Sequence, residues 1–345
     1  MDSISFTSFG LVVLDEIRFP NQKPLTNVLG GSGAYATLGA RLFLPSPLSR
    51  SLAWPIHVGN DFPDAIAEHL RSWDTSLLIE RESDMPSTRG LLEYQDTTIG
   101  HKSFKYTTPV LAVQENKLQD TALLTSKVYH YLASPQDMKT RVLDLLALRE
   151  QGGILDRPLI IWEPAPLSCK PEKLEACLEA AALVDVFTPN HLELAAFFEQ
   201  SPVASFNRSE IEMLGSKFLA SGVGPEGKGA VVIRAGENGC FVQSRDIASQ
   251  WLPPFYTADM AEEHASKVVD PTGAGNAFLG GYAIGYLQRR GNILEAACYG
   301  SVAASFALEQ VGMPEKSNGR DEELWNGVSV GRRLHQYMAR QESLQ

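Results

Sequence analysis

The residues best suited to chemistry lie in the string DPTGAGN at positions 270–276. Two β-branched residues precede this string and residues 277–290 are predicted to be helical, so it forms a turn between a strand and a helix. Gly273 and Gly275 leave backbone amides uncovered, and the helix dipole adds positive charge at the same place. Such a corner binds a phosphate group or the charge that develops during phosphate transfer. A short glycine turn alone is more often structural.

The rest of the chain predicts an α/β scaffold for this corner. Of its 345 residues, 44% are hydrophobic and 21% charged, which is enough apolar material for a full core. From about residue 126 onward strands and helices alternate, which predicts a mostly parallel sheet with helices on both faces. The predicted strands are 128–132, 159–162 and 184–187, and the predicted helices are 137–151 and 171–182. No repeat or low-complexity linker divides the chain, so one domain at 1–320 is expected, followed by a helical extension at 321–345.

A candidate substrate-binding acid lies near the start of the chain. Residues 6–14 are predicted to form a buried first strand, with Asp15 at its C-terminal end. Because ligands of open parallel sheets gather at the C-terminal ends of strands, Asp15 is a candidate to bind substrate hydroxyls. Residues 84–108 hold two alternating stretches separated by polar residues, which predicts a hairpin. Arg89, in this hairpin, fits either a solvated strand residue or a contact to substrate.

A second glycine-rich turn, GGSGAYA at residues 30–36, opens a helix predicted to end at Leu42. A dinucleotide fingerprint is the alternative for this stretch. The third glycine of that fingerprint is missing, and no acid follows at the expected distance of about 20 residues. Dinucleotide binding is therefore set aside.

Two further motifs follow predicted strands. Asn190 and Glu193 stand three residues apart in the first turn of a predicted helix, and so project from the same side. Local sequence favours an N-cap with a capping-box acid, but a carboxylate beside a phosphate also suits Mg²⁺, which keeps most of its waters. Residues 229–233 form a predicted strand that leads into Arg234, Gly236 and Gly239. Glycine at these positions lets the backbone turn and approach phosphates closely.

Taken together, these motifs resemble the signatures of the PfkB (ribokinase-like) carbohydrate kinase family over about residues 5–315, in the same order. DPTGAGN is similar to the second signature, Asp-Thr-x-Gly-Ala-Gly-Asp, and GGSGAY to the first, Gly-Gly-x-x-x-Asn. The turn at 57–62 is similar to Val-Gly-x-Asp, the pair at 190–193 to Asn-x-x-Glu, and the loop at 234–239 to Thr-x-Gly-x-x-Gly. The resemblance implies a ribokinase-like fold with a small β lid made from segments 16–28 and 84–108.

The resemblance also implies ATP-dependent phosphoryl transfer to a hydroxyl of a carbohydrate or nucleoside-like small molecule. The implied site residues are Asp15, Gly30, Gly31, Ser32 and Tyr35 for the acceptor, Gly273, Ala274, Gly275 and Asn276 for catalysis, and Asn190, Glu193, Arg234, Gly236 and Gly239 for the nucleotide. The implied cofactors are ATP and Mg²⁺, with Glu193 holding the ion through water. A monovalent cation is implied at the loop that contains Asp270.

Two positions depart from the family pattern, and both lie on the acceptor side. Asn276 stands where the family has the Asp that takes the proton from the substrate hydroxyl, and an amide has no basic site near neutral pH. General-base assistance is worth about 10²–10⁴-fold in rate, whereas phosphoryl transfer depends mainly on positioning and charge stabilisation. Tyr35 stands where the family has an Asn that holds the sugar. Two hypotheses remain open: a kinase, slow or using another base, and a pseudokinase that binds a nucleotide or ligand, or acts as a scaffold, without phosphoryl transfer.

Composition limits the partners and the location. The net charge of −11 argues against binding to nucleic acid or to an anionic membrane. The chain shows no secretory signal, no apolar run of the ~20 residues that span a bilayer, and no CxxC among its four cysteines. These features predict a soluble cytoplasmic protein with reduced thiols. The resemblance adds the expectation of a homodimer formed through the lid.

Overall fold

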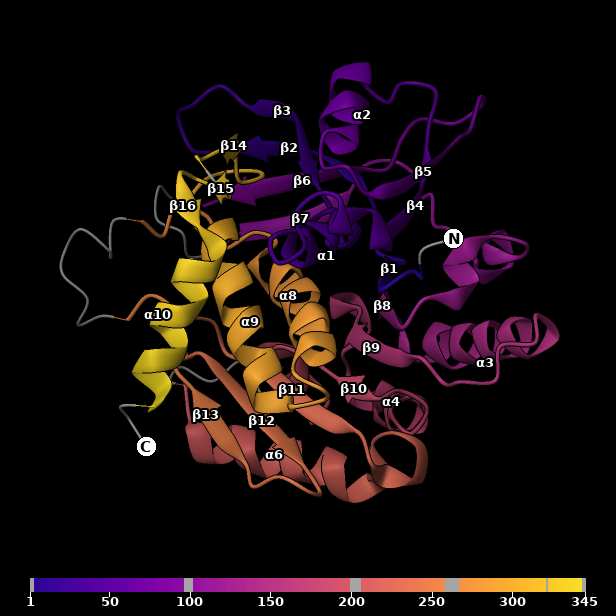
Figure 1. Ribbon diagram of the computed structural model, residues 1–345, viewed down its shortest axis with the longest axis vertical. Coiled ribbons are helices and arrows are strands. Elements are labelled where there is room, and N and C mark those ends of the chain that lie inside the picture. Colours follow the sequence, from indigo (N-terminus) through magenta and orange to yellow (C-terminus); the bar gives the residue numbers. More distant parts are fainter. Residues whose placement is uncertain (1–2, 96–101, 199–205, 258–266, 321, 343–345) are drawn as a thin grey trace.

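The computed structural model describes residues 3–95, 102–198, 206–257, 267–320 and 322–342, and its main element is a nine-stranded sheet (Figure 1). The strands of this sheet are β1 (Phe6–Ser8), β4 (Leu52–Val58), β5 (Ser76–Arg81), β8 (Val128–Ala133), β9 (Leu159–Pro164), β10 (Val186–Phe187), β11 (Ala230–Arg234), β12 (Cys240–Ser244) and β13 (Gln250–Leu252). Their order is β13-β12-β11-β10-β9-β8-β1-β4-β5. The strands from β11 to β5 are parallel to one another. At the other edge, β12 pairs antiparallel with β11, and β13 pairs antiparallel with β12.

Helices cover both faces of the sheet, as the alternation in the sequence predicts. They are α1 (Ser32–Arg41), α2 (Asp64–Arg71), α3 (Pro135–Gln151), α4 (Leu174–Ala181), α5 (His191–Ala196), α6 (Arg208–Gly222), α8 (Ala274–Gln288), α9 (Ile293–Ala307) and α10 (Val330–Glu342). Val128 and Val232 point into one core with α1, α8 and α9, whereas Tyr129 and Val231 point into a second core with α3, α4 and α6. Successive strand residues face opposite sides of a sheet. Because the adjacent residues Val128 and Tyr129 are both fully buried, as are Val231 and Val232, both faces of the sheet are covered and its strands are apolar throughout. The predicted α/β class is confirmed.

A small four-stranded sheet lies at the end of the molecule next to α1 (Figure 1). Its strands are β2 (Val13–Arg18), β3 (Leu25–Gly30), β6 (Arg89–Tyr94) and β7 (Lys102–Tyr106), in the order β3-β2-β6-β7. The hairpin predicted within residues 84–108 is β6–β7, and its polar residues 96–101 lie outside the described residues.

The prediction of one continuous first strand at residues 6–14 was wrong. β1 ends at Ser8, the chain then crosses to the small sheet, and Asp15 lies within β2 rather than at the end of a central strand. The break occurs where the backbone of Gly10 is pressed against the start of α1, because a Cβ atom on Gly10 would collide with the backbone of Gly33. The Gly33 amide also donates to the carbonyl of Leu11 at 3.0 Å. These are tertiary contacts, which the apolar pattern of the segment does not reveal.

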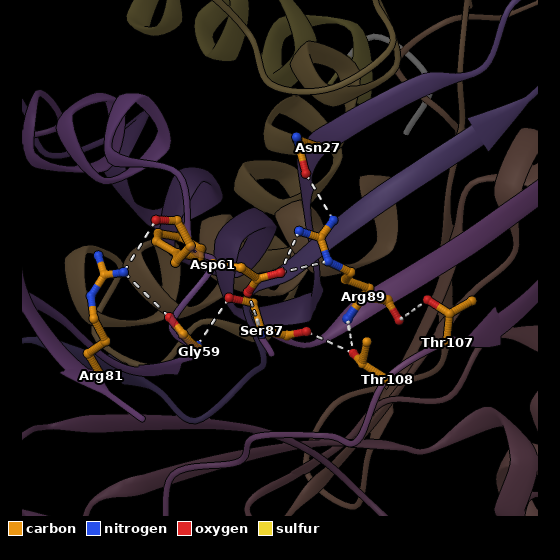
Figure 2. Close-up of polar contacts among 9 residues, drawn as sticks. Asn27, Gly59, Asp61, Arg81, Ser87, Arg89, Thr107 and Thr108 are labelled. Carbon is orange, nitrogen blue, oxygen red and sulfur yellow. Dashed lines mark hydrogen bonds and ion pairs between the residues drawn. The ribbon is translucent and has the colours of Figure 1, made fainter. Parts of the chain in front are cut away.

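The turn that follows β4 fastens the small sheet to the central one (Figure 2). Arg89 of β6 donates through Nη2 to Oδ2 of Asp61 at 2.7 Å and through Nη1 to Oδ1 of Asn27 at 2.9 Å. The amide of Ser87 donates to Oδ1 of Asp61 at 2.7 Å. Arg89 is therefore a contact between two sheets rather than a solvated strand residue.

The C-terminal residues pack against α1. They form a second small sheet, β14 (Lys316–Asn318), β15 (Glu323–Trp325) and β16 (Val328–Ser329), before α10 begins. Arg41 of α1 is fully buried and donates to both carboxylate oxygens of Glu323, at 2.7 and 2.8 Å. No helix in the described part of the chain is long and apolar enough to cross a bilayer.

Replacing Asp61 with Asn tests the link between the sheets. Slight burial alone would raise the pKa of Asp61, but the Ser87 amide and Arg89 lower it from an ordinary value of 3.8 to about 2. The ionised group therefore stabilises the fold above pH ~4, and this contribution is lost as the pH falls toward ~2. Both side chains of the pair are about one-third exposed (34% and 31%). We therefore expect Asp61→Asn to lower the free energy of unfolding by only about 1 kcal/mol at neutral pH.

Urea unfolding between pH ~7 and pH ~3 measures this difference. The loss should shrink toward the acid end of the range. Asp64→Asn is the matched control, since Asp64 is 92% exposed and lies 3.6 Å from its arginine partner. An equal loss in both variants would show that the Asp61–Arg89 contact does not hold the sheets together.

Candidate functional site

The predicted anion corner is the N-terminus of α8. Gly273 is the N-cap and has φ 78°, a left-handed conformation that favours glycine. The amide of Ala274 bonds within the turn at 3.2 Å, and the amide of Ala277 closes the first helical bond to Gly273 at 2.9 Å. Between them, the amides of Gly275 and Asn276 donate to no acceptor in the described part of the chain. Two free amides at the positive end of a 15-residue helix form an anion-binding group.

Helices α1 and α8 run side by side with their backbones in contact. A Cβ atom on Gly39 would collide with the carbonyl of Ala277, and one on Gly280 with the carbonyl of Ala36. At the start of α8, a Cβ on Gly273 would collide with the ring of Tyr35. Tyr35 and Gly39 of α1 are four residues apart, and the residues that they contact, Gly273 and Ala277, are also four residues apart. The two helices are therefore parallel, and their N-termini lie at the same end.

Tyr35 forms the wall between the two predicted halves of the site. Its side chain is 3% exposed, its ring covers Gly273, and its hydroxyl donates to the carbonyl of Gly312 at 3.4 Å. Burial raises the pKa of Tyr35 far above its ordinary range, and the nearby charges of Asp270 and Asp15 add to this effect. The phenol therefore remains a protonated donor at every physiological pH.

Asp15 lies flat against the backbone of the small sheet. A Cβ atom on Gly30 would collide with one of its carboxylate oxygens, and a Cβ on Gly90 with the other. The side chain is 5% exposed. Phe104 and Tyr106 lie on β7, which is separated from β2 by β6. Their rings stand nearly at right angles with centroids 5.0 Å apart, and both residues are partly exposed. Burial raises the pKa of Tyr106 and the charge of Asp15 raises it further, so the acid lies close to exposed aromatic surface, an arrangement suited to a hydroxylated ring.

The remaining residues of the first signature have structural contacts. Gly31 is the N-cap of α1 with φ 97°, which a side chain rarely adopts. The hydroxyl of Ser32 accepts a hydrogen bond from the amide of Leu11 at 3.2 Å, and so ties the β1–β2 connection to α1. Gly30 provides the space that Asp15 occupies.

Asn190 and Glu193 form a capping box at the start of α5. Oδ1 of Asn190 accepts from the amides of Leu192 and Glu193 at 2.9 Å, and Oε2 of Glu193 accepts from the amide of Asn190 at 2.7 Å. The capping interpretation is therefore correct as a description of the local structure. It does not exclude contact with phosphate, because Oε1 of Glu193 makes no hydrogen bond within the described residues.

Arg234, at the end of β11, connects this acid with the anion corner. It is 8% exposed, and its Nη2 lies 2.7 Å from Oε1 of Glu163 and 3.5 Å from Oε2 of Glu193. Nη2 also donates to the carbonyl of Thr188 at 2.9 Å. Nη1 lies against the first turn of α8, where a Cβ atom on Gly275 would collide with it.

Glu163 is a site residue that the sequence argument missed. It lies near the end of β9, is 4% exposed, and makes the closest ion pair of Arg234. The signal was present in the sequence, because an acid that follows an apolar strand is the same pattern that singles out Asp15. Its pairing with Arg234 could not be read from the sequence, since the two residues are on strands separated by β10.

The two glycines of the nucleotide loop differ in their surroundings. Gly236 has φ 58°, and a Cβ atom there would meet nothing within 4 Å, so its backbone lies open. Gly239 has φ 84°, and a Cβ there would collide with the carbonyl of Leu252. The structure therefore leaves Gly236 accessible to a ligand and uses Gly239 to turn the chain into β12.

The acid of the DPTGAGN string is occupied by contacts within the protein. Oδ1 of Asp270 accepts from the amide of Thr272 at 2.9 Å, from its hydroxyl at 2.6 Å, and from the hydroxyl of Tyr94 in β6 at 2.8 Å. The described residues contain no group of three or more His, Cys, Asp or Glu side chains that could hold a metal ion. Mg²⁺ keeps most of its waters, so Oε1 of Glu193, which makes no hydrogen bond within the described residues, suits an ion held through water.

Asn276, at the position of the family's base, has a side-chain oxygen that is fully buried and has no hydrogen-bond partner in the described part of the chain. A buried acceptor without a donor is unfavourable by about 1–3 kcal/mol, which a hydroxyl-bearing ligand would relieve. Tyr35 and Arg234 both lie against the start of α8, and Arg234 is 3.5 Å from Glu193. Asp15 is near enough for its charge to raise the pKa of Tyr35.

The sheet order, the helices on both faces, the small added sheet and the anion corner define a ribokinase-like fold. The chain belongs to the pfkB family of carbohydrate kinases, whose family model matches residues 8–318. An uncharacterized protein of Schizosaccharomyces pombe is 33% identical over 97% of this chain and 92% of its own length. Protein MAK32 of Saccharomyces cerevisiae is 26% identical over 96% of this chain and 91% of its own.

Solved structures share the fold. The ribokinase of Giardia lamblia has a TM-score of 0.69 at 17% identity and covers 98% of this chain and 99% of its own. An Escherichia coli protein assigned as a ribokinase II, solved with ATP and Mg²⁺, has a TM-score of 0.65 at 18% identity and covers 98% of this chain and 100% of its own.

Replacing Glu193 with Gln tests the charge state of the buried cluster. Burial raises the pKa of Glu193 from 4.5 to about 7, with Glu163 adding to the effect and Arg234 and the Asn190 amide opposing it. Because the pKa of Glu193 is higher in the folded protein than in the unfolded chain, the protonated side chain stabilises the fold. This contribution is complete below pH ~4.5 and is lost as the pH rises through ~7. Gln keeps the capping box and cannot ionise.

The free energy of unfolding of the natural protein, measured by urea titration, should fall relative to Glu193→Gln between pH ~5 and ~8. The expected change is on the order of 1–3 kcal/mol. Glu175→Gln, at an exposed position of α4, is the control and should show no such change. A pH-independent difference between Glu193→Gln and the natural protein would mean that Glu193 ionises normally.

Proposed function

We propose that this protein is an ATP-dependent phosphotransferase that acts on a hydroxyl of a carbohydrate or nucleoside-like small molecule. The observation that carries the proposal is the contact of Tyr35 with Gly273, since it puts a residue of the predicted substrate turn against the predicted anion corner. A hydroxyl bound at Asp15 is then held beside the amides to which a transferred phosphoryl group would bind. Positioning of this kind supplies most of the rate in phosphoryl transfer.

The chain's own residues divide the work in a definite way. Asp15 accepts hydrogen bonds from substrate hydroxyls, and the exposed rings of Phe104 and Tyr106 support a ring face. The amides of Gly275 and Asn276 stabilise the charge on the phosphoryl group as the new O–P bond forms and the bond to ADP breaks. The buried Oδ1 of Asn276 accepts from the reacting hydroxyl and orients it. It cannot take the proton, which leaves to a phosphate oxygen or to water.

The nucleotide would lie along the open backbone at Gly236 with its phosphates toward α8. When bound, Mg²⁺ neutralises charge between the phosphates, and Glu193 would hold it through water. The loop at Asp270 is proposed as a monovalent-cation site, and the small sheet as a surface for a second copy. A cytoplasmic location agrees with the use of ATP and with four buried free cysteines, which a reducing compartment preserves.

A binding protein without phosphoryl transfer is the second candidate. Two observations favour it: residue 276 is Asn and provides no base, and the bulky Tyr35 lies in the predicted acceptor site. Such a protein would bind the same nucleotide and small molecule in the same cleft, and no phosphorylated product would form.

Asn276→Asp separates the two candidates. If the site transfers phosphate, the natural protein should form product slowly, and restoring a base should raise the rate by about 10-fold or more, up to ~10⁴-fold. Product formation from ATP is measured by mass spectrometry over a wide panel of sugars, polyols and nucleosides. The natural protein and the variant are assayed in parallel at equal concentration.

Asn292→Asp is the matched control, because Asn292 caps α9 and Asp caps a helix equally well. Its rate should equal that of the natural protein. Nucleotide binding without product from either form, over the whole panel, would favour the binding protein. Failure of both forms to bind nucleotide would exclude both candidates.

A further inference from the structure

The guanidinium group of Arg234 has donors that the protein does not use. Arginine presents five N–H groups in a planar fork. Nη2 makes the ion pair with Glu163 and the hydrogen bond to the carbonyl of Thr188. Nε is fully buried and donates to nothing in the described part of the chain, and no hydrogen bond of Nη1 is formed there. A side chain that is 8% exposed thus keeps three of its N–H groups without acceptors.

These donors lie beside the unused amides of α8. Nη1 is against Gly275, whose amide, like that of Asn276, also lacks an acceptor in the described residues. Unlike Nε, Nη1 is not a fully enclosed atom, so this end of the guanidinium has some exposed surface. A cation at the N-terminus of a helix faces the positive end of the helix dipole, which is unfavourable unless an anion lies between them.

The acids behind Arg234 explain why it stays in this place. Glu163 and Glu193 both lie near Nη2, and their charges offset part of the charge of the guanidinium. They leave the edge that carries Nη1 to face the corner. A tetrahedral anion placed there would accept from Nη1 and from the two amides together, and the guanidinium fork suits phosphate oxygens.

We propose that Arg234 is a fixed cation of the phosphate site, which binds the polyphosphate of a nucleotide together with the amides of Gly275 and Asn276. Part of the charge that a divalent ion neutralises is thereby neutralised by the protein. Nucleotide binding then does not depend on Mg²⁺. This inference rests on the proposed function, since it assumes that a nucleotide occupies the site.

Binding of ATP is measured by titration calorimetry in two conditions, with Mg²⁺ and with excess EDTA. The natural protein should bind in EDTA with a dissociation constant within about 10-fold of its value in Mg²⁺. Arg234→Gln should weaken binding in EDTA by about 10- to 100-fold, as expected for loss of a charge-assisted bond to phosphate. The loss should be smaller in Mg²⁺, because the ion supplies charge that the variant lacks.

Arg234→Gln leaves Glu163 buried without a counter-charge, which destabilises the fold. The double variant Glu163→Gln/Arg234→Gln removes both charges, and thermal unfolding shows whether it is folded. It should show the same loss of binding in EDTA. Arg208→Gln is the matched control, since Arg208 lies over the ring of Trp251 at the start of α6 and should bind like the natural protein.

The outcomes separate this inference from the proposed function. Binding of the natural protein only with Mg²⁺, or equal binding in EDTA by the natural protein and the folded double variant, would overturn the role of Arg234 and leave the proposed function standing. No binding of ATP in either condition would remove the proposed function itself. Weak binding in EDTA by the double variant alone supports the role of Arg234.

Discussion

The backbone contact between α1 and α8 is the constraint on which the site depends. Glycines at 39 and 280 allow the backbones of the two helices to touch without intervening side chains. Because helix N-termini carry the free amides, the parallel arrangement places two sets of amides at one end of the molecule. A larger residue at either glycine would separate the helices by the width of a side chain, and would move Tyr35 away from Gly273. Close packing of small residues is therefore what converts two separate turns into one site.

Much of this arrangement could be predicted from the sequence, and the limits have physical causes. Alternating strands and helices and the hairpin at 84–108 leave local patterns, and the structure contains each of them. The string at 270–276 likewise predicts a turn into a helix, and α8 begins there. The break after Ser8 leaves no local pattern. The residues that link β1 to β2 are apolar and mostly buried, as are the strands on either side of them. The ion pair of Glu163 and Arg234 was also hidden. It joins the ends of two strands that are neighbours of β10 and far apart in the chain.

The net charge of the chain is a poor guide to what its cleft binds. A protein with a net charge of −11 would be expected to repel a polyphosphate. Under the proposed function, the backbone amides at the start of α8 and one buried cation, Arg234, offset this repulsion locally. Buried groups are screened little by salt, so their local field outweighs that of distant surface charges. The ion pair of Arg89 and Asp61, unlike the buried Arg234, is partly exposed. It serves mainly to position the small sheet against the central one.

Besides Tyr35 and Asn276, Arg234 also differs from the signature that its loop resembles, and Arg234 and Asn276 change the charge of the corner in the same direction. At residue 234 the common family residue is a neutral Thr and this chain has Arg, which makes the corner one charge unit more positive. The family signature that DPTGAGN resembles ends in Asp, whereas this chain has Asn276, and an ionised Asp replaced by Asn adds one further unit of the same sign. The removal of an acid would weaken proton abstraction, whereas both changes would strengthen the hold on an anion. Together, Arg234 and Asn276 would favour anion binding over proton abstraction at this corner.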